Sequence, residues 1–141
     1  MLSMKRYKLI DHTADFGIQA WGKDLSELFV NAAEGMFNLI ADISKVKPAE
    51  KIEISLESSD ENELLRNWLA ELLYYRNNKN MLLCKFKVHK ITGKSIVSTA
   101  EGELIDEKRH TLLREVKAVT FHQLDIKKEG SLLTTNVIFD V

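Results

Sequence analysis

Four polar side chains that could do chemistry stand within five positions near the start of the chain, in the segment DHTAD: Asp11, His12, Thr13 and Asp15. Carboxylates and hydroxyls are hard oxygen donors, which Ca²⁺, Mg²⁺ and Mn²⁺ prefer as ligands. The same residue types also form tight turns, because their side chains hydrogen-bond to nearby backbone groups. The spacing in DHTAD therefore predicts either a cation site or a turn, and the residues alone leave both readings open.

A second acidic feature ends the sequence, where Asp140 is followed by Val141. The residues before it alternate in a strand-like pattern that places Asp140 on the face opposite to Phe139. If this last strand lies beside the strand that begins at Phe16, Asp140 and the main-chain oxygens of Val141 come close to Asp15. The predicted cation site depends on that pairing. The alternative is that Asp140 is a solvated residue at a strand end.

Other chemistries find little support in the residues. The six glycines form neither a G-x-G-x-x-G nor a Walker-type segment. One cysteine and four dispersed histidines cannot supply a zinc site of the usual kind, and no nucleophile elbow is present. Cys84 stands alone in the apolar segment LLCKFKV, which predicts a buried, inert thiol. An enzyme is therefore weakly supported, although a Ser-His-Asp arrangement stays open.

Three further polar residues each have two readings. His12 is more typical of a hydrogen-bonded turn than of a metal ligand. Lys117 could seek a phosphate group or simply solvate the surface. His122 alternates with Leu124 and Ile126, which predicts a half-buried histidine on the face of a strand.

The elements that must position these residues follow from hydrophobic periodicity. The patterns predict strands at 5–12, 16–22 and 51–58, helices at 24–42 and 59–80, and two hairpins, 82–91 with 95–104 and 118–128 with 132–141. Asp24 with Glu27 is typical of a capping box, and Ser59 or Asp60 can cap the second helix. Trp21 and Trp68 are expected to pack in the core. Strands mixed with two helices and without a βαβ rhythm predict an α+β fold, a mainly antiparallel sheet with two helices packed on it.

Length and charge set the class of protein. The 141 residues are enough for a single domain, 1–141, with a sizeable core. A net charge of −1 argues against a broadly basic nucleic-acid-binding surface. Neither a signal peptide nor an apolar segment of membrane-spanning length is visible, so we expect a cytoplasmic protein without a membrane partner.

Longer segments carry a family resemblance. The segment DHTADFGIQAWGKDLSELFVNAAEGMFNLI closely resembles the opening signature of the archease family. The resemblance continues through SSDENELLRNWLAELLYY, AEGELIDEKRHTLLREVKAVTFHQLDI and the terminal FDV, and so covers nearly the whole chain in the order of the family. It implies a small α+β protein that acts with the tRNA-splicing RNA ligase, a GTP- and Mn²⁺-dependent enzyme that passes through a guanylylated histidine.

The resemblance implies a role without catalysis. The protein would promote guanylylation and multiple turnover of the ligase and broaden its nucleotide use during tRNA exon ligation, with only indirect contact to RNA. The alternative that the resemblance also suggests is a chaperone-like binding module for RNA-modifying enzymes such as tRNA methyltransferases.

The resemblance also implies a set of site residues. A divalent cation, Ca²⁺ with Mg²⁺ or Mn²⁺ as alternatives, would be bound by Asp15, Asp140 and Val141. Supporting or partner-contact roles would fall to Asp11, His12, Lys117 and His122, and no residue would be catalytic.

Overall fold

Two helices and two antiparallel sheets make up the described part of the chain. The structure is a computed structural model that describes residues 7–11 and 16–141 and, for Asp11, the backbone. Its elements are β1 (Tyr7–Asp11), β2 (Phe16–Gly22), α1 (Leu25–Ile40), the 3₁₀ helix η1 (Ile43–Lys45), β3 (Glu50–Glu57), α2 (Glu61–Lys79), β4 (Met81–Ile91), β5 (Ser95–Leu104), β6 (Ala118–Val119), β7 (Lys127–Glu129) and β8 (Leu132–Asp140). The predicted α+β class, with antiparallel strands and two packed helices, is confirmed.

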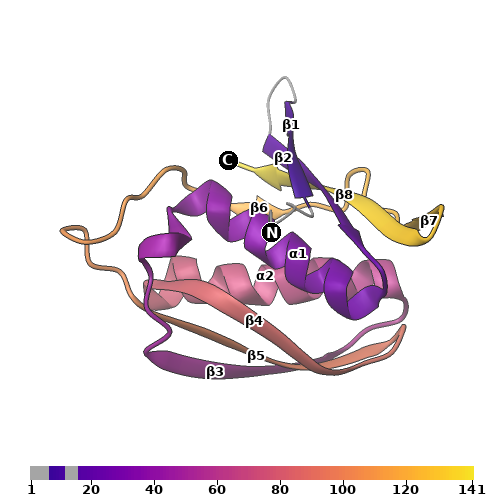
Figure 1. Cartoon of the computed structure of the whole chain (residues 1–141), viewed down its shortest axis with the longest axis horizontal. Coiled ribbons are helices and arrows are strands. Elements are labelled where there is room, and N and C mark those ends of the chain that lie inside the picture. The colour runs from indigo at the N-terminus through magenta and orange to yellow at the C-terminus, as the bar shows by residue number, and fades with distance from the viewer. Residues whose placement is uncertain (1–6, 12–15) are drawn as a thin grey trace, which may run out of the picture.

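The strands divide between two sheets. One sheet has the order β1-β2-β8-β6, with β7 also paired to β8, and the other has the order β3-β5-β4. Figure 1 shows the two helices as a layer between these sheets. The sequence analysis predicted one sheet, whereas the structure has two.

Helix α1 explains why two sheets are needed, because it is buried on two sides. It contacts β2 on one side and β4 on the other. Toward the first sheet, Gly35 lets the helix approach closely, since a Cβ there would lie 2.8 Å from Cδ1 of Ile18. Toward the second sheet, the rings of Phe37 and Phe86 lie 5.6 Å apart between centroids. A helix with two apolar sides needs an apolar partner on each.

Both helices begin at the predicted capping residues. The Asp24 side chain accepts a 2.9 Å hydrogen bond from the Glu27 N–H, and Asp60 accepts one of the same length from the Glu63 N–H. Helix α2 ends before Asn80, which has the left-handed conformation (φ 59°) common after helices. Over the described ranges, neither helix has the length and the apolar character that crossing a membrane requires.

Trp68 lies at the centre of the core. Its side chain is fully buried and packs 5.6 Å from the Phe29 ring between centroids. The indole N–H donates a 2.9 Å hydrogen bond to Oγ of Ser98, which in turn donates to the Ile54 carbonyl at 2.9 Å. This pair of bonds joins α2 to two strands of the second sheet. The core position predicted for Trp68 is confirmed, whereas Trp21 is half-buried with the Lys8 ammonium 5.8 Å from its ring centroid.

The continuous strand predicted over 118–128 is present only at its two ends, as β6 and β7, which both pair with β8, and the predicted hairpin around Gly130 is confirmed. Between these ends the chain leaves the sheet after Val119. Thr120 starts a turn in which its hydroxyl donates to the Ile138 carbonyl at 2.9 Å and accepts from the His122 N–H at 3.2 Å. Gln123 then has a positive φ of 59°, which an extended strand does not allow. His122 is exposed in this turn, so the predicted half-buried histidine is also wrong.

Candidate functional site

The predicted site depends on the pairing of β2 with β8, and the structure has this pairing. Phe16, the first residue of β2, lies opposite Phe139, and the Asp11 backbone lies opposite Phe16 on the other side. The described chain end therefore lies next to the facing ends of β1 and β2 (Figure 1). Asp15 and His12 lie outside the described residues, so the role of each stays a prediction.

The chain end is held in place on both sides. Fully buried Phe139 anchors the end of β8, and the half-buried Val141 packs against the core. Asp140 is exposed between them. Its carbonyl accepts a 2.7 Å hydrogen bond from the Lys117 N–H, next to the pairing of β6 with β8. The structure thus presents the exposed Asp140 from a strand end that is anchored by buried Phe139 and by the bond to Lys117.

Arg114 packs against the same end of the first sheet. Its guanidinium carbon lies 4.3 Å from the centroid of the Phe16 ring. One guanidinium nitrogen donates to the Leu39 carbonyl at 3.4 Å, and the Leu113 N–H donates to the Ile40 carbonyl at 2.8 Å. These bonds satisfy carbonyls at the C-terminus of α1, whose last turn has no basic residue of its own. The segment before Lys117 therefore connects the end of α1 to the start of β2.

The chemistry available here is that of oxygen donors. Among the described residues, no group of three or more His, Cys, Asp or Glu side chains is placed to hold a metal ion. Asp140 supplies one carboxylate, and Val141 can add main-chain oxygens. Such donors suit a hard cation such as Ca²⁺, and the predicted third ligand, Asp15, immediately precedes Phe16 in the sequence.

Of the two supporting residues in the second half of the chain, Lys117 and His122, Lys117 lies nearer to the chain end. Its backbone is bonded to Asp140, and its exposed side chain lines a groove beside α2. His122 lies five residues further on, in the turn that follows β6.

Sequence reasoning missed an ionic cluster that supports this region and in which Glu103 and His110 are buried and Arg109 is exposed. Glu103 accepts hydrogen bonds from two Arg109 nitrogens at 2.6 and 3.2 Å and from the Lys47 N–H at 2.8 Å. The ring of buried His110 contacts the same carboxylate at 2.9 Å through Nε2, while its Nδ1 accepts from the Asp106 N–H. Because Nδ1 is the acceptor, Nε2 carries the proton. The cluster fastens the 105–110 loop, and so the start of the segment that carries Arg114 and Lys117, to the end of β5.

The ionic cluster around Glu103 makes the stability of the fold depend on pH. The Arg109 guanidinium, with the Lys47 N–H, lowers the pKa of Glu103 from 4.5 to about 2. A carboxylate with a lowered folded-state pKa stabilises the fold above its unfolded-state pKa and loses that contribution as the pH falls toward the folded value. We expect the wild type to exceed Glu103→Gln in free energy of unfolding at neutral pH, by a difference that shrinks between pH 5 and about 2.

Urea denaturation at a series of pH values measures this difference. The control is Glu101→Gln, since Glu101 makes a looser ion pair, 3.8 Å from the exposed Lys51, and such pairs contribute little. If the difference in free energy of unfolding between the wild type and Glu103→Gln does not change with pH, the lowered pKa of Glu103 is contradicted.

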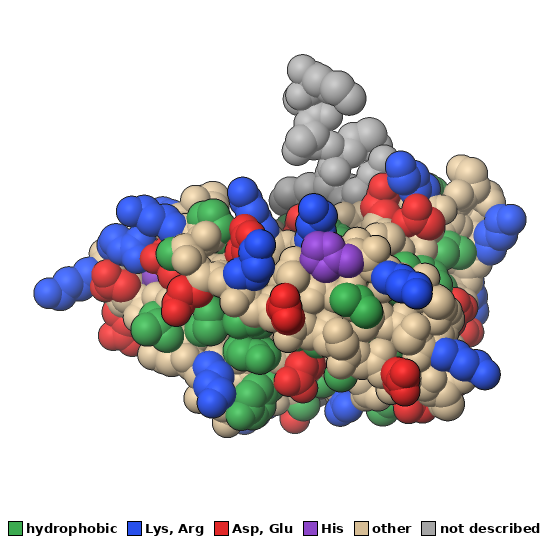
Figure 2. Space-filling model, turned by 90° about the horizontal axis from the view of Figure 1, so that it is seen from below, with side chains coloured by type: hydrophobic (Ala, Val, Ile, Leu, Met, Phe, Trp, Pro, Cys, Tyr) green, Lys and Arg blue, Asp and Glu red, His purple; other side chains and the backbone are tan. Residues whose placement is uncertain are grey.

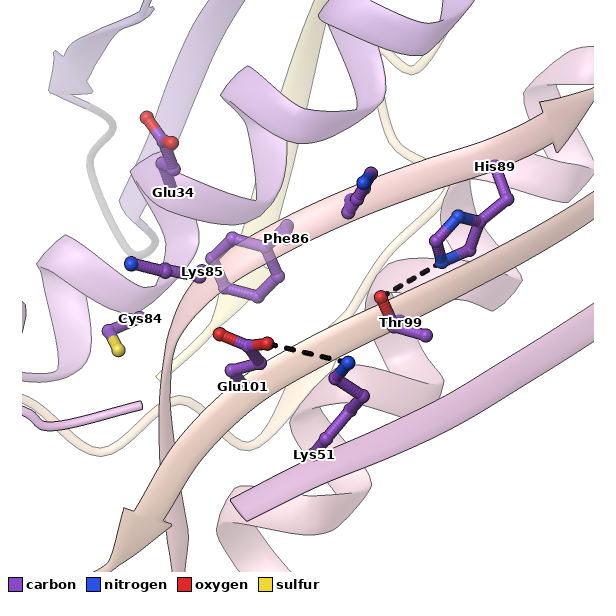
Figure 3. A pocket seen from close by; sticks show the side chains of 9 residues that line it. Glu34, Lys51, Cys84, Lys85, Phe86, His89, Thr99 and Glu101 are labelled. Atoms are coloured by element: carbon purple, nitrogen blue, oxygen red, sulfur yellow. Dashed lines mark hydrogen bonds and ion pairs between the residues drawn. The ribbon is translucent and has the colours of Figure 1, made fainter. Parts of the chain in front are cut away.

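A cavity of about 410 Å³ beside β4 is an alternative candidate for an active site. Figure 3 shows Lys51 pointing toward Glu101, and His89 contacting the Thr99 hydroxyl at 3.0 Å. Within the described residues, no carboxylate hydrogen-bonds to the other His89 nitrogen, so the imidazole lacks the orienting partner of a catalytic triad. Cys84 is half-buried and lines this cavity, so the predicted full burial of the thiol is wrong. Its partial burial raises the pKa of the thiol, which disfavours the reactive thiolate.

The charges on that side of the molecule are also mixed. Figure 2 shows the molecule from below, with basic and acidic side chains interspersed over the surface. The cavity itself is lined by three lysines, Lys51, Lys85 and Lys87, and by two carboxylates, Glu34 and Glu101. The chain end therefore remains the stronger candidate site.

Comparison with known proteins gives one consistent result. The model of the archease protein family (MTH1598/TM1083) matches residues 7–141. Protein archease of Methanothermobacter thermautotrophicus is 43% identical over 141 residues, which cover 98% of this chain and 100% of the relative.

Two solved structures are similar in fold. The solution structure of Methanobacterium thermoautotrophicum protein 1598 matches with a TM-score of 0.85 at 42% identity, over 98% of this chain and 100% of that one. The crystal structure of an archease described as a possible chaperone, from Thermotoga maritima, matches with a TM-score of 0.66 over 100% of both chains. Its identity is 19%, so this second likeness concerns the fold alone.

Proposed function

The chain belongs to the archease family, and from this premise we propose that it is a non-catalytic activator of the GTP- and Mn²⁺-dependent tRNA-splicing RNA ligase. In this role it promotes guanylylation and multiple turnover of the ligase and broadens the choice of nucleotide. It acts in the cytoplasm, and its site binds a divalent cation, with Ca²⁺, Mg²⁺ and Mn²⁺ as the candidates.

The observation that carries the proposal is the position of the acidic chain end. Asp140 is exposed at the end of β8, beside the first residue of β2, on a strand anchored by buried Phe139. An exposed carboxylate at an anchored strand end suits docking into a basic, RNA-binding cleft of a partner. Since β2 begins directly after DHTAD, Asp15 can complete the ligand set together with Asp140 and Val141.

A divalent cation at such a site supplies positive charge that offsets the charge of phosphate groups. The residues of this chain hold the ligands in place: Phe139 and Phe16 fix the two strand ends, and Arg114 packs on the Phe16 ring. In the partner pocket, the site would help to seat GTP and Mn²⁺ for attack by the ligase histidine.

A single-turnover guanylylation assay tests the proposal. Purified ligase, GTP and Mn²⁺ are mixed with this protein at one tenth of the ligase concentration, in the absence of RNA. We expect faster guanylylation and more than one ligase molecule activated per molecule of this protein. An unchanged rate at every protein concentration would refute the activator role.

A second candidate is a chaperone-like module for RNA-modifying enzymes such as tRNA methyltransferases. The related Thermotoga maritima protein is described as a possible chaperone. Large apolar side chains exposed here, with more than half of their surface accessible, include Leu104, Leu113 and Phe121. A chaperone of this type would suppress aggregation of a heated methyltransferase at near-equimolar amounts, whereas an activator would not.

A further inference from the structure

A groove runs along the outer side of α2, between the helix and the segment that includes β6. Its volume is about 260 Å³. The lining residues are Arg66, Ala70, Leu73, Tyr74, Asn77, Asn78, Lys117, Ala118 and Val119. The helical positions in this α2 groove extend from 66 to 78, which corresponds to roughly 18 Å along the helix axis.

The charge of the α2 groove favours an anionic occupant. Its lining contains two cations, Arg66 and Lys117, and no carboxylate. Arg66 is held in place, because its Nε donates to the Val119 carbonyl at 3.0 Å and a second nitrogen donates to Asn67 at 3.2 Å. The Lys117 side chain is exposed, and its backbone N–H is bonded to the Asp140 carbonyl.

One exposed aromatic ring lines the groove and a second lies beside it, against Arg66. Tyr74 is 43% exposed and lines the groove, and Phe121, at 55%, lies under the Arg66 guanidinium at 5.0 Å from its centroid. Tyr74 packs edge-on against Tyr75, with ring centroids 5.8 Å apart. Flat, exposed rings next to cations are the features with which proteins bind unpaired nucleotides, since bases stack on rings and phosphates contact the cations.

We propose that the α2 groove binds single-stranded RNA. Bases stack on Tyr74 and Phe121, phosphates contact Arg66 and Lys117, and the amide of Asn78 is available for hydrogen bonds. An acidic peptide would use the cations but would leave the two exposed rings without a flat partner, so the combination favours RNA.

The position of the groove connects this proposal to the chain end. Lys117 lies at the groove and its N–H is bonded to the Asp140 carbonyl at 2.7 Å. An RNA strand in the groove would therefore pass close to the acidic end of β8. The inference rests on the proposed function, which supplies the RNA, and it adds a direct contact to a role for which only indirect RNA contact was expected.

Fluorescence anisotropy with the protein alone tests the groove. The probe is a labelled 12-nucleotide RNA without secondary structure, with the corresponding RNA duplex as a second probe. Loss of one stacking ring is expected to weaken binding about 10-fold, so we expect this loss for Tyr74→Ala and for Phe121→Ala. Tyr74→Phe should retain affinity, because it keeps the ring, and the duplex should bind more weakly than the single strand.

Two further variants complete the experiment. Leu104→Ala is the matched control, since Leu104 is 56% exposed and Phe121 55%, and it should bind RNA as the wild type does. Lys117→Glu should lower the slope of log affinity against log salt by about one. Circular dichroism checks that each variant is folded.

The outcomes separate this proposal from the activator role. If both folded ring variants bind the RNA as tightly as the wild type does, the proposal that the groove binds single-stranded RNA is overturned. Equal affinity of the wild type for the duplex and the single strand would overturn it as well. The same variants losing affinity for the ligase but not for RNA would assign the groove to protein docking and overturn the proposal. Guanylylation without RNA should be unchanged in Tyr74→Ala and Phe121→Ala, so failure of that assay with the wild type bears on the proposed function instead.

Discussion

Replacing Asp140 by alanine is expected to lower the affinity of the protein for Ca²⁺ or Mn²⁺ at least about 10-fold, because cation affinity in oxygen sites follows the number of charged ligands. Asp140 is the exposed carboxylate at the end of β8, and the neighbouring β2 begins directly after the predicted ligand Asp15. The same variant is expected to lose stimulation of ligase guanylylation. Isothermal titration calorimetry with each cation measures the affinity, and the single-turnover assay measures the stimulation.

The matched control for this experiment is Asp125→Ala. Asp125 is also an exposed aspartate, and it lies 3.7 Å from the ammonium of Lys127. We expect this variant to bind cations and to stimulate the ligase as the wild type does. If Asp140→Ala is folded and retains wild-type cation affinity, Asp140 is not a ligand. If both variants lose affinity equally, the effect is one of net charge and not of a site.

Replacing Trp68 by alanine is expected to lower the free energy of unfolding by about 3–5 kcal/mol, the usual cost of removing a large buried aromatic side chain. Trp68 is fully buried between α2 and the second sheet, and its loss also leaves the Ser98 hydroxyl without the indole donor. Since small domains have about 5–15 kcal/mol of stability, this is a large fraction of the total. Guanidinium denaturation followed by far-ultraviolet circular dichroism measures the change.

Two further variants serve as comparisons for the stability loss of Trp68→Ala. Trp68→Phe keeps most of the apolar volume but removes the N–H donor, so we expect an intermediate loss. Trp21→Ala removes a tryptophan that is only half-buried, and the expected loss is smaller than for Trp68→Ala. Equal losses for the two tryptophan-to-alanine variants would contradict the central position of Trp68 in the core.

The features that were predicted correctly are encoded locally. Helix α1 begins after Asp24 and helix α2 after Asp60, because each aspartate caps its own helix within three residues. The β4–β5 hairpin flanks Gly93 as its turn residues indicate. The alternation along the last strand predicted that Asp140 and Phe139 point to opposite faces of the sheet. Phe139 is buried and Asp140 is exposed, as this predicts.

The features that were missed depend on partners far away in the sequence. Alternation along β5 places Glu103 on the outer face of its sheet, yet Glu103 is buried because the loop that carries Arg109 and His110 folds over it. The division into two sheets depends on the second apolar side of α1. The break after Val119 depends on the Thr120 hydroxyl, which bonds to the Ile138 carbonyl and so turns the chain.

The candidate site was predicted in part from local patterns and in part missed because it depends on distant partners. Residue types at the two ends of the sequence suggested its residues, the family resemblance favoured them as ligands, and their role stays a prediction. The pairing that brings those ends together was inferred from hydrophobic patterns. The pairing of Phe16 with Phe139 confirms that inference. The role of Arg114 had no local signal, because its partners, the Phe16 ring and the Leu39 carbonyl, are 98 and 75 residues away in the sequence.

Paramagnetic Mn²⁺, added to ¹⁵N-labelled protein and followed by NMR, tests most directly whether the two strand ends share one cation. If they do, substoichiometric Mn²⁺ selectively broadens the amide signals nearest the end of β8, those of Phe16, Ala118 and Val141, and Asp140→Asn abolishes the effect. Broadening that is centred on other acidic residues, such as those of β3, or that persists in Asp140→Asn, would show that the cation does not bind where β2 meets β8.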